Sequence, residues 1–294
     1  MKKYILRLLL LLFVLLPAFA LLSFSESSRR VMGMKGDVRR IIEATYHLKI
    51  DSSGQTVKNG LRDSSVFVFN RAGFETQELK FIFRKTENHS IRSEFRYEDD
   101  SLLVFSSDFQ DAVLADSILF QNGKNGQQQT AEIYLPSLNK HVHRNYTWKN
   151  GRIEAVTDLS EKGDSLFYTV YEYFSSGRKK SEQNFEHSNE GRLRPTMMIR
   201  YNYNEQGRIA ATQTTIAGSG EPSQIQYTYY DNGEKKSMTR STSFGATTYF
   251  YEYEYDAQGN WIKQTAFNET KSKGVELSEK RPVSVTERKI EYAD

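Results

Sequence analysis

Two histidines and a stripe of tyrosines are the side chains of this sequence with the chemistry to hold a ligand. His141 and His143 stand two residues apart in NKHVHRN, so a strand would point both imidazoles from one face, where they could share a metal ion. The chain contains no cysteine, and neither histidine has an acidic partner that the sequence identifies. We interpret both as surface residues and expect no metal and no other cofactor.

The sequence lacks the common catalytic templates. It has no Gly-x-Ser-x-Gly elbow, no His-Glu-x-x-His helix, no Gly-x-x-x-x-Gly-Lys phosphate loop and no cysteine nucleophile. We therefore expect a protein that is not an enzyme. An enzyme of unrecognised type stays open as a third hypothesis.

The tyrosine stripe is clearest in YFYEYEYDAQGNWIKQT, residues 249–265. Alternate residues of a strand share a face, so four tyrosines from Tyr249 to Tyr255 would face one way and Glu252 and Glu254 the other. The acidic face must meet water. The tyrosine face either packs across neighbouring strands or forms an aromatic platform for sugar rings or a protein partner, and we favour packing.

Turn glycines reveal that this stripe belongs to a repeat. Gly151, Gly177, Gly207, Gly233 and Gly259 are separated by 26, 30, 26 and 26 residues, which is the length of two strands and two turns. DAQG, NEQG and FSSG are typical of hairpins closed by a type I turn and a left-handed glycine, whereas KNG and DNG carry the Asn-Gly pair of two-residue hairpins. VFVFNRAGFE repeats the spacing around Gly73.

Tyrosine occupies the positions six and four residues before the glycine in four successive units. We expect aligned hairpins to stack these rings in columns across the sheet, and the short turn at Gly233 could bring Tyr230 into the column in place of Tyr229. The candidate binding residues are therefore these tyrosines and one nearby tryptophan: Tyr171, Tyr173, Tyr201, Tyr203, Tyr227, Tyr229, Tyr253, Tyr255 and Trp261.

Short alternating runs rich in Tyr, Phe, Val, Ile and Thr recur from residue 38 onward, and helical periodicity is nearly absent. We predict an all-β fold, an elongated, twisted antiparallel sheet built as a meander of hairpins, although the sequence does not decide whether this sheet stays open or closes. The expected divisions are a signal segment (1–20), a polar linker (21–30), a degenerate part of the sheet (31–145), the hairpin repeats (146–274) and a final strand (275–294). Residues 108–120 could instead hold a short helix.

Two segments resemble known repeats. YEYDAQGNWIKQT is similar to the tyrosine-aspartate repeats of RHS proteins, of the form Y-x-Y-D-x-x-G-N, and YYDNGEKKSM resembles a MORN-like repeat variant of bacterial antitoxin-like proteins. The resemblance covers residues 146–267, and these motifs are short. It implies hairpins that continue a sheet, and it implies no activity.

The first residues set the compartment. Lys2 and Lys3, an apolar run and Ala18-Phe19-Ala20 follow the secretory pattern, so we expect export, with cleavage near Ala20 or retention as a membrane anchor. Removing residues 1–20 takes three of the 40 basic residues and leaves 37 against 37 acidic ones, which argues against nucleic acid as a partner. Only 38% of the chain is hydrophobic, which favours an elongated architecture over a thick globule.

We accordingly expect an exported protein, periplasmic, outer-membrane-associated or extracellular, that contacts the membrane only through an uncleaved leader. The favoured role is a non-catalytic scaffold of the cell envelope that offers a sheet face or edge to an envelope protein. The alternative is carbohydrate or peptidoglycan binding through the tyrosine columns.

Overall fold

The computed structural model describes residues 27–84, 87–188, 191–219, 221–272 and 279–293. The predicted signal segment lies outside the described residues, as does most of the linker. Among the described residues, no helix is long and apolar enough to cross a bilayer.

Strands are the main regular structure of the described chain. One short helix, α3 (Ser28–Val31), precedes them, and a 3-10 turn, η1 (Pro136–Leu138), interrupts them. The strands are β1 (Val38–Ile50), β2 (Thr56–Phe69), β3 (Glu75–Phe83), β4 (Asn88–Glu98), β5 (Leu102–Gln110), β6 (Val113–Asn122), β7 (Gln128–Leu135), β8 (Lys140–Lys149), β9 (Arg152–Ser160), β10 (Ser165–Tyr173), β11 (Lys179–His187), β12 (Leu193–Tyr203), β13 (Ile209–Ile216), β14 (Ser223–Tyr229), β15 (Lys235–Thr242), β16 (Gly245–Tyr255), β17 (Trp261–Ser272) and β18 (Arg281–Tyr292).

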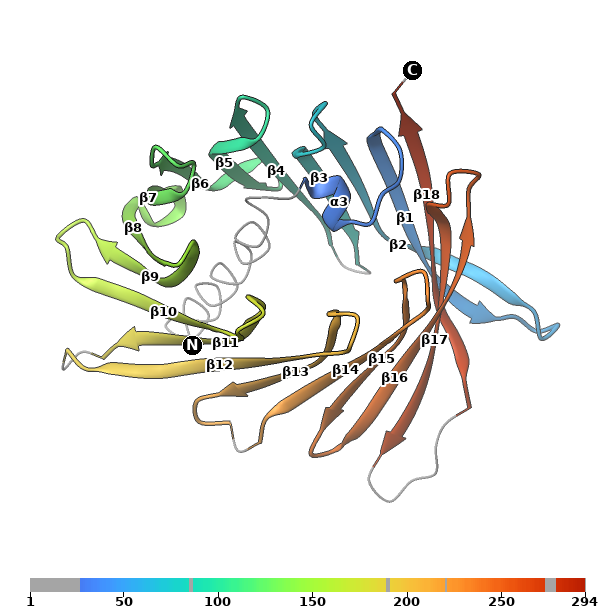
Figure 1. Cartoon of the computed structure of the whole chain (residues 1–294). Coiled ribbons are helices and arrows are strands. Elements are labelled where there is room, and N and C mark those ends of the chain that lie inside the picture. The colour runs from blue at the N-terminus through green and yellow to red at the C-terminus, as the bar shows by residue number, and fades with distance from the viewer. Residues whose placement is uncertain (1–26, 85–86, 189–190, 220, 273–278, 294) are drawn as a thin grey trace.

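The strands form one closed antiparallel barrel (Figure 1). Each strand pairs with the next along the chain, and β1 also pairs with β18, from Val38 opposite Tyr292 to His47 opposite Ser284. The all-β prediction is confirmed, but the predicted elongated sheet is wrong, because the last strand returns to the first. This pairing also decides that the sheet closes, a question that the sequence left open. Closure satisfies the backbone groups that an open sheet would leave at its two edges. Residues 108–120 belong to β5 and β6 and form no helix.

The turn glycines behave as their spacing predicts. In FSSG, Phe174 N–H donates to the Arg178 carbonyl and Gly177 N–H to the Phe174 carbonyl, and Gly177 has φ +88°. The same pair of bonds recurs at NEQG and DAQG. KNG is the expected two-residue turn, with positive φ at Asn150 and Gly151.

The DNG turn differs from its prediction. It is a five-residue turn like the others, with Tyr230 N–H donating to the Glu234 carbonyl at 2.8 Å. Tyr229 therefore keeps its place in the strand, opposite Lys235. A bulge after Thr228 absorbs the extra residue, and a bulge recurs at the corresponding position of the neighbouring hairpins.

The tyrosine face of the sheet points into the barrel. Figure 1 shows α3 on the inner side of the ring of strands. The residues just after α3, Met32 and Met34, pack against Val38, Ile41 and Phe69, which share this face. Most of the buried side chains lie on it.

The outer face mixes charged and polar side chains with apolar ones. Lys263 on β17 pairs across it with Glu254 on the neighbouring β16 at 2.6 Å, and Lys58 on β2 reaches over β1 to Glu287 on β18 at 2.8 Å. Between β14 and β15 its cross-strand pairs are glutamines, serines and threonines, such as Gln226 opposite Thr239. On β1 to β3 the same face carries Ile42, Val66 and Leu79.

Candidate functional site

The predicted tyrosine columns are interrupted in the barrel. The eight tyrosines lie on the inner face of β10, β12, β14 and β16, and the strands between carry other residues opposite them: Glu182 opposite Tyr171, Thr212 opposite Tyr201, and Met238 opposite Tyr227. The prediction that aligned units would stack these rings is wrong, because equivalent strands of successive hairpins are never adjacent in an antiparallel meander. The tyrosine-bearing strands instead pair directly with the second strand of the preceding hairpin.

A recurrent hydrogen bond shows what most of these tyrosines do. Tyr203 donates its hydroxyl proton to the carbonyl of Lys179 at 2.8 Å, and Lys179 is the second residue after the turn glycine of the preceding hairpin. The same bond joins Tyr173 to Ile153, Tyr229 to Ile209 and Tyr253 to Lys235. These four tyrosines tie each hairpin to its predecessor, which is a structural role.

An arginine ladder accompanies these bonds. Arg152, Arg178 and Arg208 each follow a turn glycine, and each guanidinium lies over the tyrosine ring of the next hairpin, 5.5 to 5.7 Å from its centroid. The same arginines cover the next turn glycine, so a Cβ at Gly207 would overlap the Arg178 guanidinium. The glycines are required both for their positive φ and for this close approach.

The other predicted residues also serve packing. Trp261 is buried, and the Arg288 guanidinium lies 3.2 Å from its ring centroid. Tyr201 donates to Glu182 at 3.2 Å, and the Lys179 ammonium lies 4.6 Å from the Tyr171 ring. Tyr227 is half-buried on the inner wall.

Two of the predicted residues, Tyr253 and Tyr255, border an open cavity. This rim cavity has a volume of about 490 Å³ and is lined by Tyr230, Asp231, Asn232, Glu252, Tyr253 and Tyr255. Its volume lies in the range of small-molecule sites. The turn between β14 and β15 supplies one wall and the end of β16 supplies the other.

The cavity exists because β16 runs past its paired neighbour. The β15–β16 pairing ends at Ser237 opposite Phe250, whereas β16 continues to Tyr255. The turn leans against this extension: Tyr230 donates to the Tyr251 carbonyl at 2.9 Å, and the Asn232 amide donates to the Tyr255 hydroxyl at 2.7 Å. These two hydrogen bonds fix the β14–β15 turn against the end of β16, where it forms one wall of the cavity.

The chemistry of the rim cavity is aromatic and acidic. Tyr255 is 40% exposed and offers a ring face, and the Tyr230 and Tyr253 rings meet edge to face at 6.2 Å. Burial raises the pKa of Tyr253, so its hydroxyl stays protonated at neutral pH. Asp231 adds a carboxylate and Asn232 an amide, whereas Glu252, which also lines the cavity, pairs its carboxylate with Lys280 at 3.3 Å.

Sequence reasoning missed Tyr230, Asp231, Asn232 and Glu252. YYDNG is the one repeat turn among those compared that carries a second tyrosine directly after the column position, and this doubling was the available signal. A two-residue Asn-Gly turn would make the second tyrosine a shift in register, whereas the five-residue turn places Tyr230 in the turn itself.

A second group of acids lines the inner wall of β3, β5 and β6. Asp108 lies opposite Asp116, and burial with the nearby Asp108 raises the pKa of Asp116 to about 7. Burial also raises the pKa of Glu78 and Asp108, and that of Glu75 to about 8. No three His, Asp or Glu residues of the described chain are grouped to hold a metal. His143 binds Glu132 on the outer face, and His141 stacks on Tyr134.

No protein-family model matches the chain, and no curated protein matches it. Among solved structures, it is similar to porin-like proteins from Bacteroides uniformis (12% identity, 87% of this chain and 99% of that chain, TM-score 0.45) and Bacteroides vulgatus (9% identity, 87% and 98%, TM-score 0.31). It is also similar to TcdB2-TccC3 (10% identity, 82% of this chain and 16% of that chain, TM-score 0.32). At these low scores we infer nothing about function from them.

Proposed function

We propose that this protein is an exported, non-catalytic binding barrel of the cell envelope, which stands in water and takes an uncharged saccharide in its rim cavity. The observation that carries the proposal is the cavity itself, where an exposed tyrosine ring lies beside hydrogen-bonding groups. In this proposal the carbohydrate of the predicted alternative binds at Tyr255, and most of the other predicted tyrosines stabilise the fold.

The outer wall supports water as the surroundings. A transmembrane barrel presents an apolar band about 25 Å tall to the lipid, and an arginine or lysine at its midplane costs about 2–4 kcal/mol. Charged side chains here occupy the outer face, as in the pair of Lys263 on β17 with Glu254 on β16 and the pair of Lys280, just before β18, with Glu252. A lipid-facing wall would need these positions to be apolar.

The lining residues support a saccharide over an anion. Tyr255 and Tyr253 offer ring faces and hydroxyls, Asn232 offers an amide, and the Asp231 carboxylate accepts hydrogen bonds from sugar hydroxyls. None of the six lining residues is a lysine or arginine, and the nearby Lys280 ammonium already pairs with Glu252 at 3.3 Å, so a phosphate or carboxylate ligand would meet the negative charge of Asp231.

A scaffold that presents its outer face is the second candidate. Phe81 on β3 and Leu119 on β6 lie on that face and are 37% and 51% exposed, which offers a protein partner apolar contact. The predicted alternative of binding at a sheet edge is wrong, because the closed barrel has no free edge among its described strands.

The test is titration calorimetry of the mature chain with a neutral N-acetylglucosamine tetramer. We expect Tyr255→Ala to weaken binding at least tenfold, equivalent to about 1.4 kcal/mol. Tyr249→Ala is the matched control, because Tyr249 lies on the same face of the same strand outside the cavity. Absence of binding by the native chain, or an equal loss in both variants with folding intact, would refute the proposal.

A pull-down from envelope proteins separates the two candidates. The native chain and the Tyr255→Ala variant serve as baits, and Phe81→Ser serves as the outer-wall variant. A protein captured by the first two and lost with Phe81→Ser would support the scaffold, whereas loss with Tyr255→Ala alone would place the contact at the rim.

A further inference from the structure

The arginine ladder breaks where the barrel closes. Gly151, Gly177 and Gly207 are each followed by an arginine, but Gly233 is followed by Glu234 and Gly259 by Asn260. The turn at Gly259 therefore receives no cation from the preceding hairpin. The β2–β3 turn at Gly73 has no repeat hairpin beside it on the β1 side, because β1 and β18 are paired there but are not joined by a turn.

We propose that residues 27–37, the strap, take the place of the missing hairpin and lock the seam between the first and last strands. The strap runs along the inner wall at the turn end of the barrel, from the β2–β3 turn to the β16–β17 turn. It supplies one cation to each of two turns that the ladder does not cover, those of Gly73 and Gly259. Three sets of contacts carry this inference.

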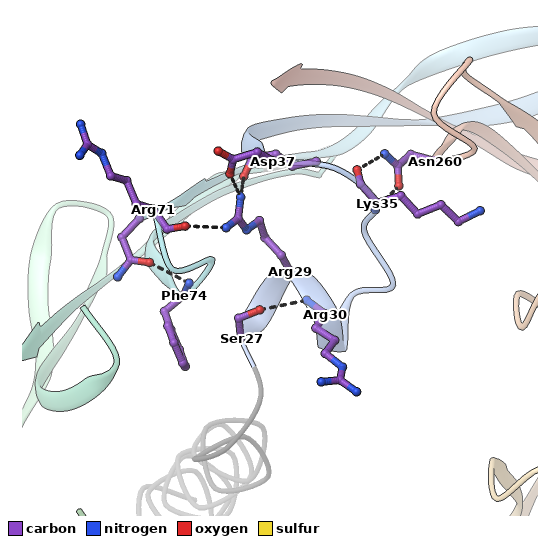
Figure 2. Close-up of polar contacts among 10 residues, drawn as sticks. Ser27, Arg29, Arg30, Lys35, Asp37, Arg71, Phe74 and Asn260 are labelled. Atoms are coloured by element: carbon purple, nitrogen blue, oxygen red, sulfur yellow. Dashed lines mark hydrogen bonds and ion pairs between the residues drawn. The ribbon is translucent and has the colours of Figure 1, made fainter. Parts of the chain in front are cut away.

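Lys35 covers the turn of β16 and β17. Its ammonium lies 2.8 Å from where a Cβ of Gly259 would stand, the place that Arg178 and Arg208 take in other hairpins. Asn260 is 2% exposed and holds the Lys35 backbone from both sides: its amide donates to the Lys35 carbonyl at 2.8 Å, and the Lys35 N–H donates to its carbonyl oxygen at 2.7 Å (Figure 2). Burial raises the pKa of Glu234, and the nearby positive charge of Lys35 opposes that rise.

Arg29 covers the turn of β2 and β3. Its N–H donates to the Gly73 carbonyl at 3.0 Å, and its guanidinium donates to the Arg71 carbonyl at 2.7 Å and pairs with Asp37 (Figure 2). A Cβ at Gly73 would overlap this guanidinium, as at Gly207. The Glu75 N–H donates to the Ser28 hydroxyl at 3.0 Å, which pins the strap to β3.

Apolar contacts cover the seam between these two points. Met32 and Met34 pack against a buried cluster formed by Val38 and Ile41 on β1 and Phe69 on β2, and Ile290 and Tyr292 on β18 pack against the same cluster. Val38 and Ile41 are fully buried. Beside them, the Ala293 N–H donates to the Asp37 carbonyl at 2.8 Å. The strap therefore contacts both sides of the β1–β18 junction.

Hydrogen exchange of residues 21–294, the chain without its predicted signal segment, tests the strap. We expect Asn260→Ala combined with Arg29→Ala to speed amide exchange in β1 and β18 at least tenfold, while amides of β10 to β13 keep their protection, because the lock acts only at the seam. Arg178→Ala is the matched control, since it removes a rung of the ladder far from the seam.

The outcomes separate a lock from general stabilisation. Exchange that rises equally throughout the barrel, or rises at the seam as much in Arg178→Ala as in the double variant, would overturn the inference. No change in the double variant would overturn it as well. If the double variant does not fold, Asn260→Ala alone serves, and the same selective loss in β1 and β18 is expected.

Discussion

Replacing Gly207 by alanine tests the arginine ladder quantitatively. Gly207 has φ +80°, a conformation that costs an alanine about 1–2 kcal/mol. The new methyl group would also displace the Arg178 guanidinium from the Tyr203 ring, where it lies 5.6 Å from the centroid, and such a contact contributes about 0.5–1 kcal/mol at an exposed site. We expect Gly207→Ala to lower the free energy of unfolding by about 1.5–3 kcal/mol.

Gly163 provides a matched control for the backbone cost. Its turn has the same two hydrogen bonds, its φ is +83°, and nothing lies within 4 Å of its missing Cβ. Urea unfolding should give a loss of about 1–2 kcal/mol for Gly163→Ala. In the double variant Arg178→Ala, Gly207→Ala, the two costs should fall short of their sum by about 1 kcal/mol. Equal losses at Gly163 and Gly207, or strict additivity with Arg178→Ala, would refute the ladder.

Three further predictions concern single interactions. Burial raises the pKa of Glu75 from 4.5 to about 8, so the unfolded chain releases this proton at lower pH and the free energy of unfolding falls as pH rises from about 4.5 to about 8. Glu75→Gln should remove this fall, which is at most about 5 kcal/mol, in urea unfolding at pH 5 and pH 8. An unchanged dependence of stability on pH in the variant would contradict the prediction. Asp158→Ala should cost about 3–5 kcal/mol because it strands the buried Arg144, which Asp158 binds through two hydrogen bonds of 2.6 and 2.8 Å, whereas Glu254→Ala at an exposed pair should cost under about 1 kcal/mol. Tyr203→Phe should cost about 1 kcal/mol through its lost bond to the Lys179 carbonyl, and a cost near zero by thermal unfolding would count against the hairpin tie.

Local features of this fold were accessible from sequence. The glycine spacing predicted the hairpins, and the turn types at Gly177, Gly207 and Gly259 followed from the residues beside them, because a turn depends on a handful of consecutive φ and ψ angles. Alternation in 249–255 predicted which residues share a face. The DNG turn failed because Asn-Gly suits two turn types, and the bulge after Thr228 selects between them.

The rim cavity was predicted only in part. Tyr253 and Tyr255 were named, but the tyrosines were treated as equivalent in every unit, and most of them bind the preceding hairpin. What sets Tyr255 apart is the longer overhang of β16, which runs five residues past its last pair with β15 where β14 runs three past its last pair with β13, and the turn that leans against it. This longer overhang is a difference in strand register between hairpins. It cannot be predicted from the composition of β15 or of β16.

The sequence by itself determined the all-β class, the hairpin repeat, the turn glycines and an aromatic face, because each depends on residues close together in the chain. The tertiary structure decided that the sheet closes, which face became the inner wall, and that the strap meets the last hairpin. Lys35 and Asn260 are 225 residues apart, and their contact exists only once β18 has paired with β1. Closure depends on the summed twist and register of eighteen strands, so it cannot be predicted from any single segment of the sequence.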